Sequence, residues 1–279
     1  MTGHFKPFSD SHAIVEVVFF FEFAGRVVFP DDIEARVTDA VSAVEGREWR
    51  YEPVKSIKVN VAGHSTPGVS QSDDGFQMVS MRSDRPEPAW QISAYRSQIT
   101  LHCLEYSRWA LTSKMVQKYL DAVFSTLGEQ NAKVRMFGMK VLDRFVYFGE
   151  LAEFSASELF DESSEFLNKS MFRSGHRWHL HTGWFEKGAC DDEELLSQLS
   201  IDAAAIAPPD HRPNVGVSID HTLSVRAVPA RDLGDRYTVW SGSLDKVFER
   251  FELMHMRNKE IVCSLLNRDV CDSMNMHIK

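Results

Sequence analysis

Residues 12–30 read HAIVEVVFFFEFAGRVVFP, and this stretch, the most apolar of the chain, decides between a membrane segment and a core strand. A transmembrane helix needs about 20 apolar residues, whereas the run from Ile14 to Phe23 is much shorter and contains Glu16 and Glu22. Valine and phenylalanine favour strands, whose side chains alternate between two faces. The stretch therefore predicts a strand with one wholly apolar face against a core and one mixed face that carries the two glutamates.

The start of the chain predicts a cytoplasmic protein with no membrane anchor. Residues 1–10, MTGHFKPFSD, contain one lysine, and no small-residue cleavage site of a signal peptide follows them. The four cysteines form no C-x-x-C pair, so the signatures of a zinc ribbon and of a thioredoxin are missing. In a cytoplasmic protein we expect these cysteines to be reduced thiols.

Length and charge narrow the classes of protein. The chain has 279 residues, 43% of them hydrophobic, which is enough for one large domain or two small ones. The formal net charge of −9 argues against nucleic acid as a partner, because sequence-independent binding relies on Lys and Arg against phosphates. A local basic patch is the alternative, since Arg82, Arg85, Arg96 and Arg108 lie in one stretch.

The spacing of apolar residues predicts the order strand, helix, several strands, helix, and then the same order again. Helices are expected at 31–46, 112–128, 155–172 and 190–199, and from about Ser243 to Cys271. Strands are expected at 55–61, 76–83, 89–97, 98–106, 133–149, 177–188 and 214–228. Residues 62–75 are rich in Gly, Ser, Pro and Asp and predict a long mobile loop.

These elements predict an α+β fold. It consists of two similar strand-helix-strands-helix halves with antiparallel sheets, and its long helices pack on one face. The halves are expected at residues 1–130 and 131–279, with one continuous domain as the alternative. The glycine-rich phosphate-binding motifs are absent from the sequence, which disfavours a doubly wound nucleotide fold.

Two strings carry a resemblance to a known family: LHCLEYSRWALTSKMVQKYLDAVFSTLG (101–128) and MFGMKVLDRFVYFGE (136–150). They resemble an uncharacterised, sporadically distributed family of bacterial proteins of similar length. Its Y-x-x-W element before a long helix is matched by Tyr106 and Trp109, and its late Leu-His pair by Met254 and His255. The resemblance implies no known activity, substrate or cofactor. The family's sporadic occurrence implies a role in a bacterial defence or mobile-element system.

The segment HRWHLHTGW (176–184) is the best metal candidate. His179 and His181 alternate onto one face of the expected strand, a spacing that can chelate a metal through two imidazoles. His221 is a candidate third ligand, although it shares an apolar strand face and also suits a core histidine. A metal-dependent hydrolase built on this His-x-His strand is therefore one alternative for the function.

Other candidates favour binding over catalysis. Glu16 and Glu22 share a strand face but lie about 20 Å apart, whereas paired catalytic carboxylates lie within about 10 Å. Aromatic and arginine side chains near the second helix suit an interface. The residues that we assign to partner binding are Tyr106, Trp109, Glu16, Glu22, Arg96, Arg108 and His255.

The sequence favours a non-enzymatic binding protein or adaptor that acts through protein–protein contacts. We expect a protein partner, a homodimer and no cofactor. The metal-dependent hydrolase is the first alternative. A nucleic-acid-binding module that uses the arginine and aromatic stretch is the second.

Overall fold

The fold was analysed in a computed structural model. It describes residues 4–9, 12–60, 68–127, 134–187, 193–206, 214–227 and 244–274, and only the backbone of residues 55–60, 68–73, 193, 206, 226 and 227.

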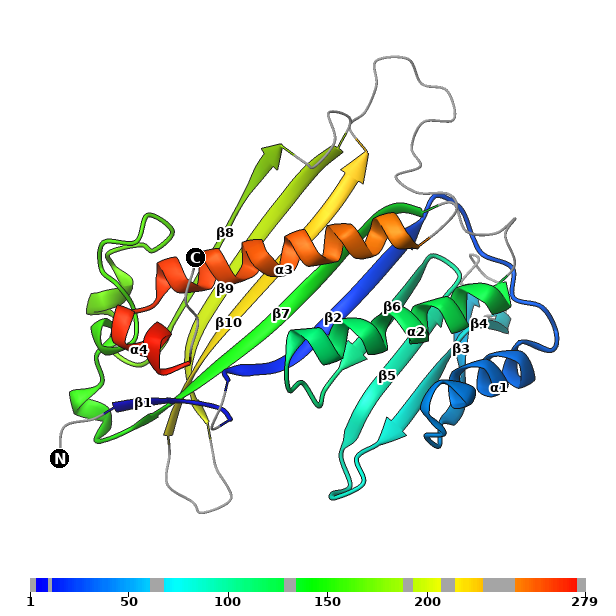
Figure 1. Ribbon diagram of the computed structural model, residues 1–279, viewed down its shortest axis with the longest axis horizontal. Coiled ribbons are helices and arrows are strands. Elements are labelled where there is room, and N and C mark those ends of the chain that lie inside the picture. The colour runs from blue at the N-terminus through cyan, green and yellow to red at the C-terminus, as the bar shows by residue number, and fades with distance from the viewer. Residues whose placement is uncertain are drawn as a thin grey trace. The chain divides into compact units, whose positions relative to one another are not determined.

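The described strands form one sheet of ten strands (Figure 1). They are β1 (His4–Pro7), β2 (Ile14–Phe23), β3 (Arg50–Asn60), β4 (Gly68–Met81), β5 (Pro88–Tyr95), β6 (Gln98–Cys103), β7 (Val134–Phe148), β8 (Trp178–Lys187), β9 (Glu193–Ile206) and β10 (Asn214–Ala227). The order across the sheet is β3-β4-β5-β6-β2-β7-β10-β9-β8, and β1 pairs with β7. Every strand pair with a described register is antiparallel.

The predicted α+β fold class is wrong. Two repeated strand-helix-strands-helix halves, each with its own antiparallel sheet and with long helices on one face, do not form. The strands build a single, mostly antiparallel sheet in which strand residues outnumber helical ones. The described helices are α1 (Ile33–Glu45), α2 (Trp109–Leu127), α3 (Asp245–Leu265) and α4 (Arg268–Ser273).

The opening apolar stretch is a strand, as its alternation predicts. β2 lies between β6 and β7, in the interior of the strand order. Val17, Phe19 and Phe21 on its apolar face are buried, whereas Glu16 and Glu22 on the other face are half-buried. The face with the glutamates is mostly half-buried, with only Val18 fully buried, which explains why two glutamates are tolerated in the most apolar run of the chain.

The chain divides into two compact units that share two strands. Unit 1 comprises Met1–Val17, Gly138–Val228 and Asp245–Lys279, and unit 2 comprises Val18–Phe137 and Pro229–Leu244. The chain passes from one unit to the other within β2 and again within β7. The boundary expected at residues 130 and 131 lies outside the described residues.

Unit 2 contains the two helices that precede β7. α1 packs against α2, and α1 ends at Gly46, whose φ of 65° is left-handed. The Phe21 ring lies 5.0 Å from that of Phe124 and 6.1 Å from that of Phe137, which joins β2 and β7 to α2. Part of the loop expected at 62–75 is strand, because β4 begins at Gly68, whereas residues 61–67 lie outside the described residues.

Two of the predicted helices, at 155–172 and 190–199, do not form in unit 1. Residues 155–172 are not an α-helix. They contain η3 (Ala156–Glu158) and the start of η4 (Met171–Arg173), two short 3-10 helices joined by turns, and η2 (Leu151–Glu153) precedes them. The Ser163 N–H donates to Asp161 Oδ1 (2.8 Å) and the Ser170 N–H to Asn168 Oδ1 (2.9 Å), local turns that compete with helical hydrogen bonds.

The second correction concerns residues 190–199, which were expected to be helical. From residue 193 onward this segment is β9, which pairs with β10 on one side and β8 on the other. The expected final helix also breaks near Leu266, between α3 and α4.

Candidate partner-binding surface

The pairing of β8, β9 and β10 in unit 1 determines which of their side chains lie on the same face of the sheet. Residues that lie opposite each other in an antiparallel pair point to the same side of the sheet. His221 lies opposite Leu199, which lies opposite Thr182. The neighbouring row contains Asp220, Ser200 and His181 and therefore points to the other side. The sheet thus separates His221 from His179 and His181, so the three candidate metal ligands are not brought together.

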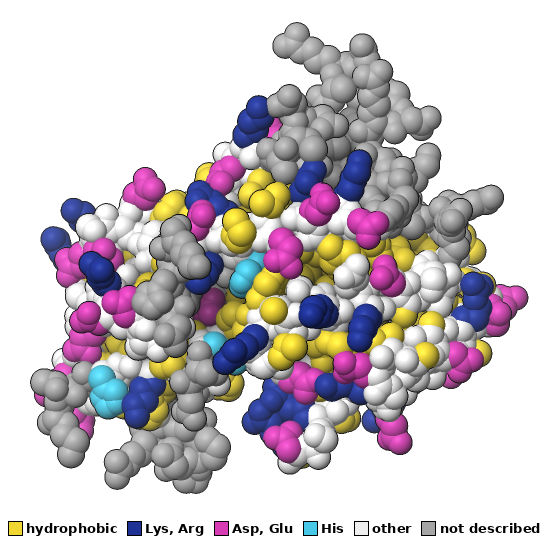
Figure 2. All heavy atoms as spheres, viewed as in Figure 1, with side chains coloured by type: hydrophobic (Ala, Val, Ile, Leu, Met, Phe, Trp, Pro, Cys, Tyr) yellow, Lys and Arg dark blue, Asp and Glu magenta, His cyan; other side chains and the backbone are white. Residues whose placement is uncertain are grey.

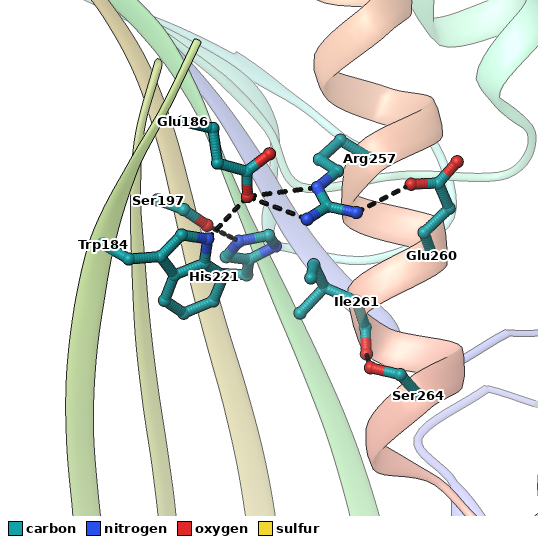
Figure 3. A network of polar contacts seen from close by, with 8 residues as sticks. All are labelled: Trp184, Glu186, Ser197, His221, Arg257, Glu260, Ile261 and Ser264. Carbon is teal, nitrogen blue, oxygen red and sulfur yellow. Dashed lines mark hydrogen bonds and ion pairs between the residues drawn. The ribbon is translucent and has the colours of Figure 1, made fainter. Parts of the chain in front are cut away.

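His221 is the centre of a buried polar network (Figure 3). Its Nε2 lies 2.8 Å from Ser197 Oγ on β9, and its Nδ1 lies 2.9 Å from Asn258 Oδ1 on α3. With the amide oxygen as acceptor, Nδ1 carries the proton and Nε2 accepts the serine hydroxyl. Burial lowers the pKa of His221, the hydrogen bond with Asn258 opposes this, and Arg257 adds to the lowering. The resulting pKa is about 4, so the ring is neutral at pH 7.

An ion-pair chain lies above this network (Figure 3). Arg257 on α3 donates to Glu186 Oε1 on β8 at 2.8 Å and pairs with Glu260 at 3.0 Å. The Trp184 indole N–H donates to the same Glu186 oxygen at 2.5 Å, and its ring stacks on His221 at 6.5 Å. Burial raises the pKa of Glu186, but the bonds from Arg257 and Trp184 outweigh burial and hold that pKa below its ordinary value.

The order of Ser197, His221 and Asn258 resembles that of a nucleophile, a base and an orienting group. The environment does not suit catalysis, because Ser197 has 0% of its surface exposed and lies in the middle of β9 rather than at a sharp turn. All three side chains instead satisfy one another in the core. We therefore interpret the network as a link that holds α3 on β9 and β10.

A cleft of about 270 Å³ opens beside the ion-pair chain. Its apolar lining comes from α3, β9 and β10 and comprises Leu253, Met254, Met256, Leu195 and Val225. Leu253 is 46% exposed and Met256 is 56% exposed. Figure 2 shows hydrophobic side chains at the surface among charged ones along the course of α3. An apolar centre with a charged rim is the usual composition of a protein interface.

No group of three or more His, Cys, Asp or Glu side chains that could hold a metal is found among the residues that the structure describes. His179 and His181 are exposed on β8, and His181 Nδ1 lies 2.7 Å from Ser200 Oγ. Asp220, which shares this face, pairs with Lys140 Nζ at 2.6 Å. The two strand histidines thus lie in a row of polar side chains.

The partner-binding residues expected near the second helix lie in unit 2. The Trp109 ring at the start of α2 lies 6.2 Å from that of Phe19, and Tyr106 is half-buried before the helix. Arg108 is exposed, and its carbonyl accepts the N–H groups of Leu111 and Thr112 in the first turn of α2.

Two of the charged residues predicted to bind a partner form ion pairs within the chain. Glu22 pairs with Arg135 at 2.7 Å, and Arg96 lies 3.6 Å from Asp74. Of the other arginines of that stretch, Arg85 pairs with Glu87. His255 on α3 is half-buried, and burial lowers its pKa to about 4.

Sequence reasoning missed the cleft on α3, although one signal was present. By their helical spacing, Phe251 and Met254 lie on the apolar flank of the last helix, whereas Leu253 and Met256 fall outside it. Two large apolar side chains off the buried stripe of a helix indicate a surface that is covered by a partner.

Neither a protein-family model nor a curated protein sequence matches this chain. Among the described residues, no helix is both long enough and apolar enough to cross a membrane.

Proposed function

We propose that this protein is a non-enzymatic binding protein that acts as an adaptor through protein–protein contacts. The observation that carries the proposal is the α3 cleft, where Leu253 and Met256 are half exposed beside a rim of charged side chains. Burial of such side chains against a partner removes apolar surface from water at about 25 cal/mol per Å². A segment of a second protein that inserts an apolar side chain into the cleft is the occupant that fits this lining.

The supporting structure beneath the cleft suits a binding surface. The ion pair of Arg257 with Glu186 ties α3 to β8, and the His221 network ties α3 to β9 and β10. A surface that is rigid before binding loses less conformational entropy when the partner docks. The polar contacts therefore support recognition by the neighbouring apolar residues.

The proposal is tested by affinity purification from the organism that makes the protein. The wild type is compared with the double variant Leu253→Asp, Met256→Asp, which places two charges in the cleft. We expect a stoichiometric partner to be recovered with the wild type and to be lost with the double variant, because a buried unpaired charge is costly.

Leu111→Asp is the matched control. Leu111 is 59% exposed on α2 in unit 2, and it does not line the cleft. This variant should retain the partner. Equal recovery by all three proteins, or no stoichiometric partner with the wild type, would contradict the proposal. The place of the adaptor in a defence or mobile-element system remains a prediction from the family resemblance.

A further inference from the structure

The break between α3 and α4 brings two cysteines together. Cys263 lies near the end of α3 and Cys271 lies in α4, eight residues further along the chain. On one uninterrupted helix, residues at that spacing are separated by about 12 Å along the axis. In the structure the helix breaks near Leu266, and Cys271 Sγ lies 3.6 Å from the carbonyl oxygen of Cys263. The Cys271 S–H can be donated either to this oxygen or to the Cys263 sulfur.

The position of α4 is fixed by hydrogen bonds to the turns that precede β8. The Asn267 N–H donates to the Leu159 carbonyl at 2.9 Å, and the Asn267 side-chain amide donates to the Ser157 carbonyl at 2.7 Å. The Leu265 carbonyl accepts the Asp161 N–H at 2.9 Å. None of these contacts involves a cysteine side chain, so the fold holds the two thiols together without a bond between them.

The two cysteines, which are thiols in the structure, differ in their surroundings. Cys263 is half-buried, whereas Cys271 is only 7% exposed. The hydrogen bond with Cys271 holds the pKa of Cys263 below its ordinary value, burial opposes this, and Lys259 adds to the lowering. The same hydrogen bond and burial raise the pKa of Cys271. A partly accessible thiol of lowered pKa beside a second cysteine is typical of redox-sensitive pairs.

We propose that Cys263 and Cys271 form a reversible disulfide within the chain by exchange with a small-molecule disulfide. The Cys263 thiolate attacks one sulfur of the small molecule, which gives a mixed disulfide and releases one thiol. The Cys271 thiolate then attacks the Cys263 sulfur and releases the second thiol. The two protein thiols are oxidised, the small disulfide is reduced, and the two protons leave on the released thiols.

The disulfide would link α4 to the end of α3. Neither cysteine lines the α3 cleft, so the proposal is independent of the proposed function. Cys103 is an internal control, because it is buried in β6. Burial is the main cause of its raised pKa, which is about 12. Cys103 should therefore remain a thiol under conditions that oxidise the pair.

Peptide mapping after exchange with glutathione tests the proposal. The full-length protein is equilibrated with mixtures of oxidised and reduced glutathione, quenched with acid, alkylated in denaturant and digested with trypsin. Cleavage after Lys259 and Arg268 places the two cysteines in separate peptides, 260–268 and 269–279. We expect mass spectrometry to find these peptides joined by a disulfide, and non-reducing gels to show a monomer.

The same exchange in urea separates the effect of the fold from that of nearness in the sequence. The equilibrium constant for forming the disulfide should be about tenfold or more larger in the folded protein, because the fold holds the two thiols together. This comparison uses the wild type and needs no substitution. A folded protein that keeps both thiols, or a disulfide that forms equally well in urea, would overturn the proposal.

Two variants test the order of the steps. Oxidation of Cys271→Ser should stop at the mixed disulfide of glutathione with Cys263. Oxidation of Cys263→Ser should leave Cys271 as a thiol in the folded protein, because Cys271 is buried. Glutathione that stays on Cys263 of the wild type while Cys271 remains a thiol would contradict the second step.

Discussion

Two buried ionisable side chains of unit 1 act on stability in opposite directions. Burial lowers the pKa of His221 to about 4, below its unfolded value of about 6.5. The contribution of neutral His221 to the free energy of unfolding is therefore lost as the pH falls from about 6.5 toward 4, because the unfolded chain takes up the proton more readily. Asp143 in β7 is only 4% exposed, and burial raises its pKa to about 7. Asp143 therefore destabilises the folded protein more as the pH rises.

The substitution Asp143→Asn tests this second effect. The folded carboxyl keeps its proton up to about pH 7, whereas the unfolded one loses it near pH 4, so the wild type loses unfolding free energy between these values. Between pH 5 and pH 8 we expect the unfolding free energy of the variant to rise by about 3 kcal/mol relative to that of the wild type. Urea denaturation of both proteins at each pH measures it. A difference that does not change with pH would mean that Asp143 is ionised in the fold.

At the scale of the element, the end of α1 depends on one glycine. Gly46 has a φ of 65°, and its N–H donates to the Ser42 carbonyl. A left-handed residue commonly ends a helix, and a Cβ in that conformation is unfavourable. Nothing lies within 4 Å of the Cβ that alanine would add at Gly46, so backbone strain alone determines the effect.

Gly46→Ala should therefore lower the unfolding free energy by about 1 kcal/mol. Gly25→Ala is the control, because Gly25 also has open space around the added Cβ but does not have a left-handed φ. It should leave stability unchanged or slightly raised. Urea denaturation of both variants gives the comparison, and equal effects would show that the conformation of Gly46 is not the cause.

The elements that were predicted correctly are those with a clear local period. The strand expected at 214–228 is β10, and its alternation places Val217, Ile219 and His221 on the buried face. The strand expected at 177–188 is β8, and the one expected at 133–149 is β7. Local alternation sufficed because each of these strands has at least one face against the core.

The wrong elements are those whose local signal was mixed. Residues 190–199 contain four consecutive acidic residues and were interpreted as a short helix, yet Leu199, Ile201 and Ala203 alternate as a strand and are buried. That period extends beyond residue 199, where the predicted helix ended. In 155–172, Leu159, Phe160 and Met171 are buried, but turns at Asp161 and Asn168 prevent a continuous helix.

At the scale of the whole molecule, the two units are interleaved along the chain. Unit 1 is built from three separate stretches, and both β2 and β7 contribute residues to each unit. Because β2 and β7 continue from one unit into the other, one unit cannot unfold without disrupting strands that also belong to the other. We therefore predict one cooperative unfolding transition rather than two.

Tryptophan fluorescence can test this cooperativity. Trp49 and Trp90 report on unit 2, whereas Trp178 and Trp184 report on unit 1. Variants that keep only one of these pairs, with all other tryptophans replaced by phenylalanine, should unfold at the same urea concentration, and that midpoint should match the one from circular dichroism. Separate midpoints for the two pairs would show that the units unfold independently.

The period of neighbouring side chains is enough to predict that residues 14–23 form a strand, which faces β8 and β10 have, and that two helices precede β7. Three features follow from the three-dimensional fold alone: the strands join in one sheet, His221 lies on the opposite face from His179 and His181, and Leu253 and Met256 line a cleft. These features depend on which strands pair and in what register, and that choice is made by contacts between residues far apart in the chain.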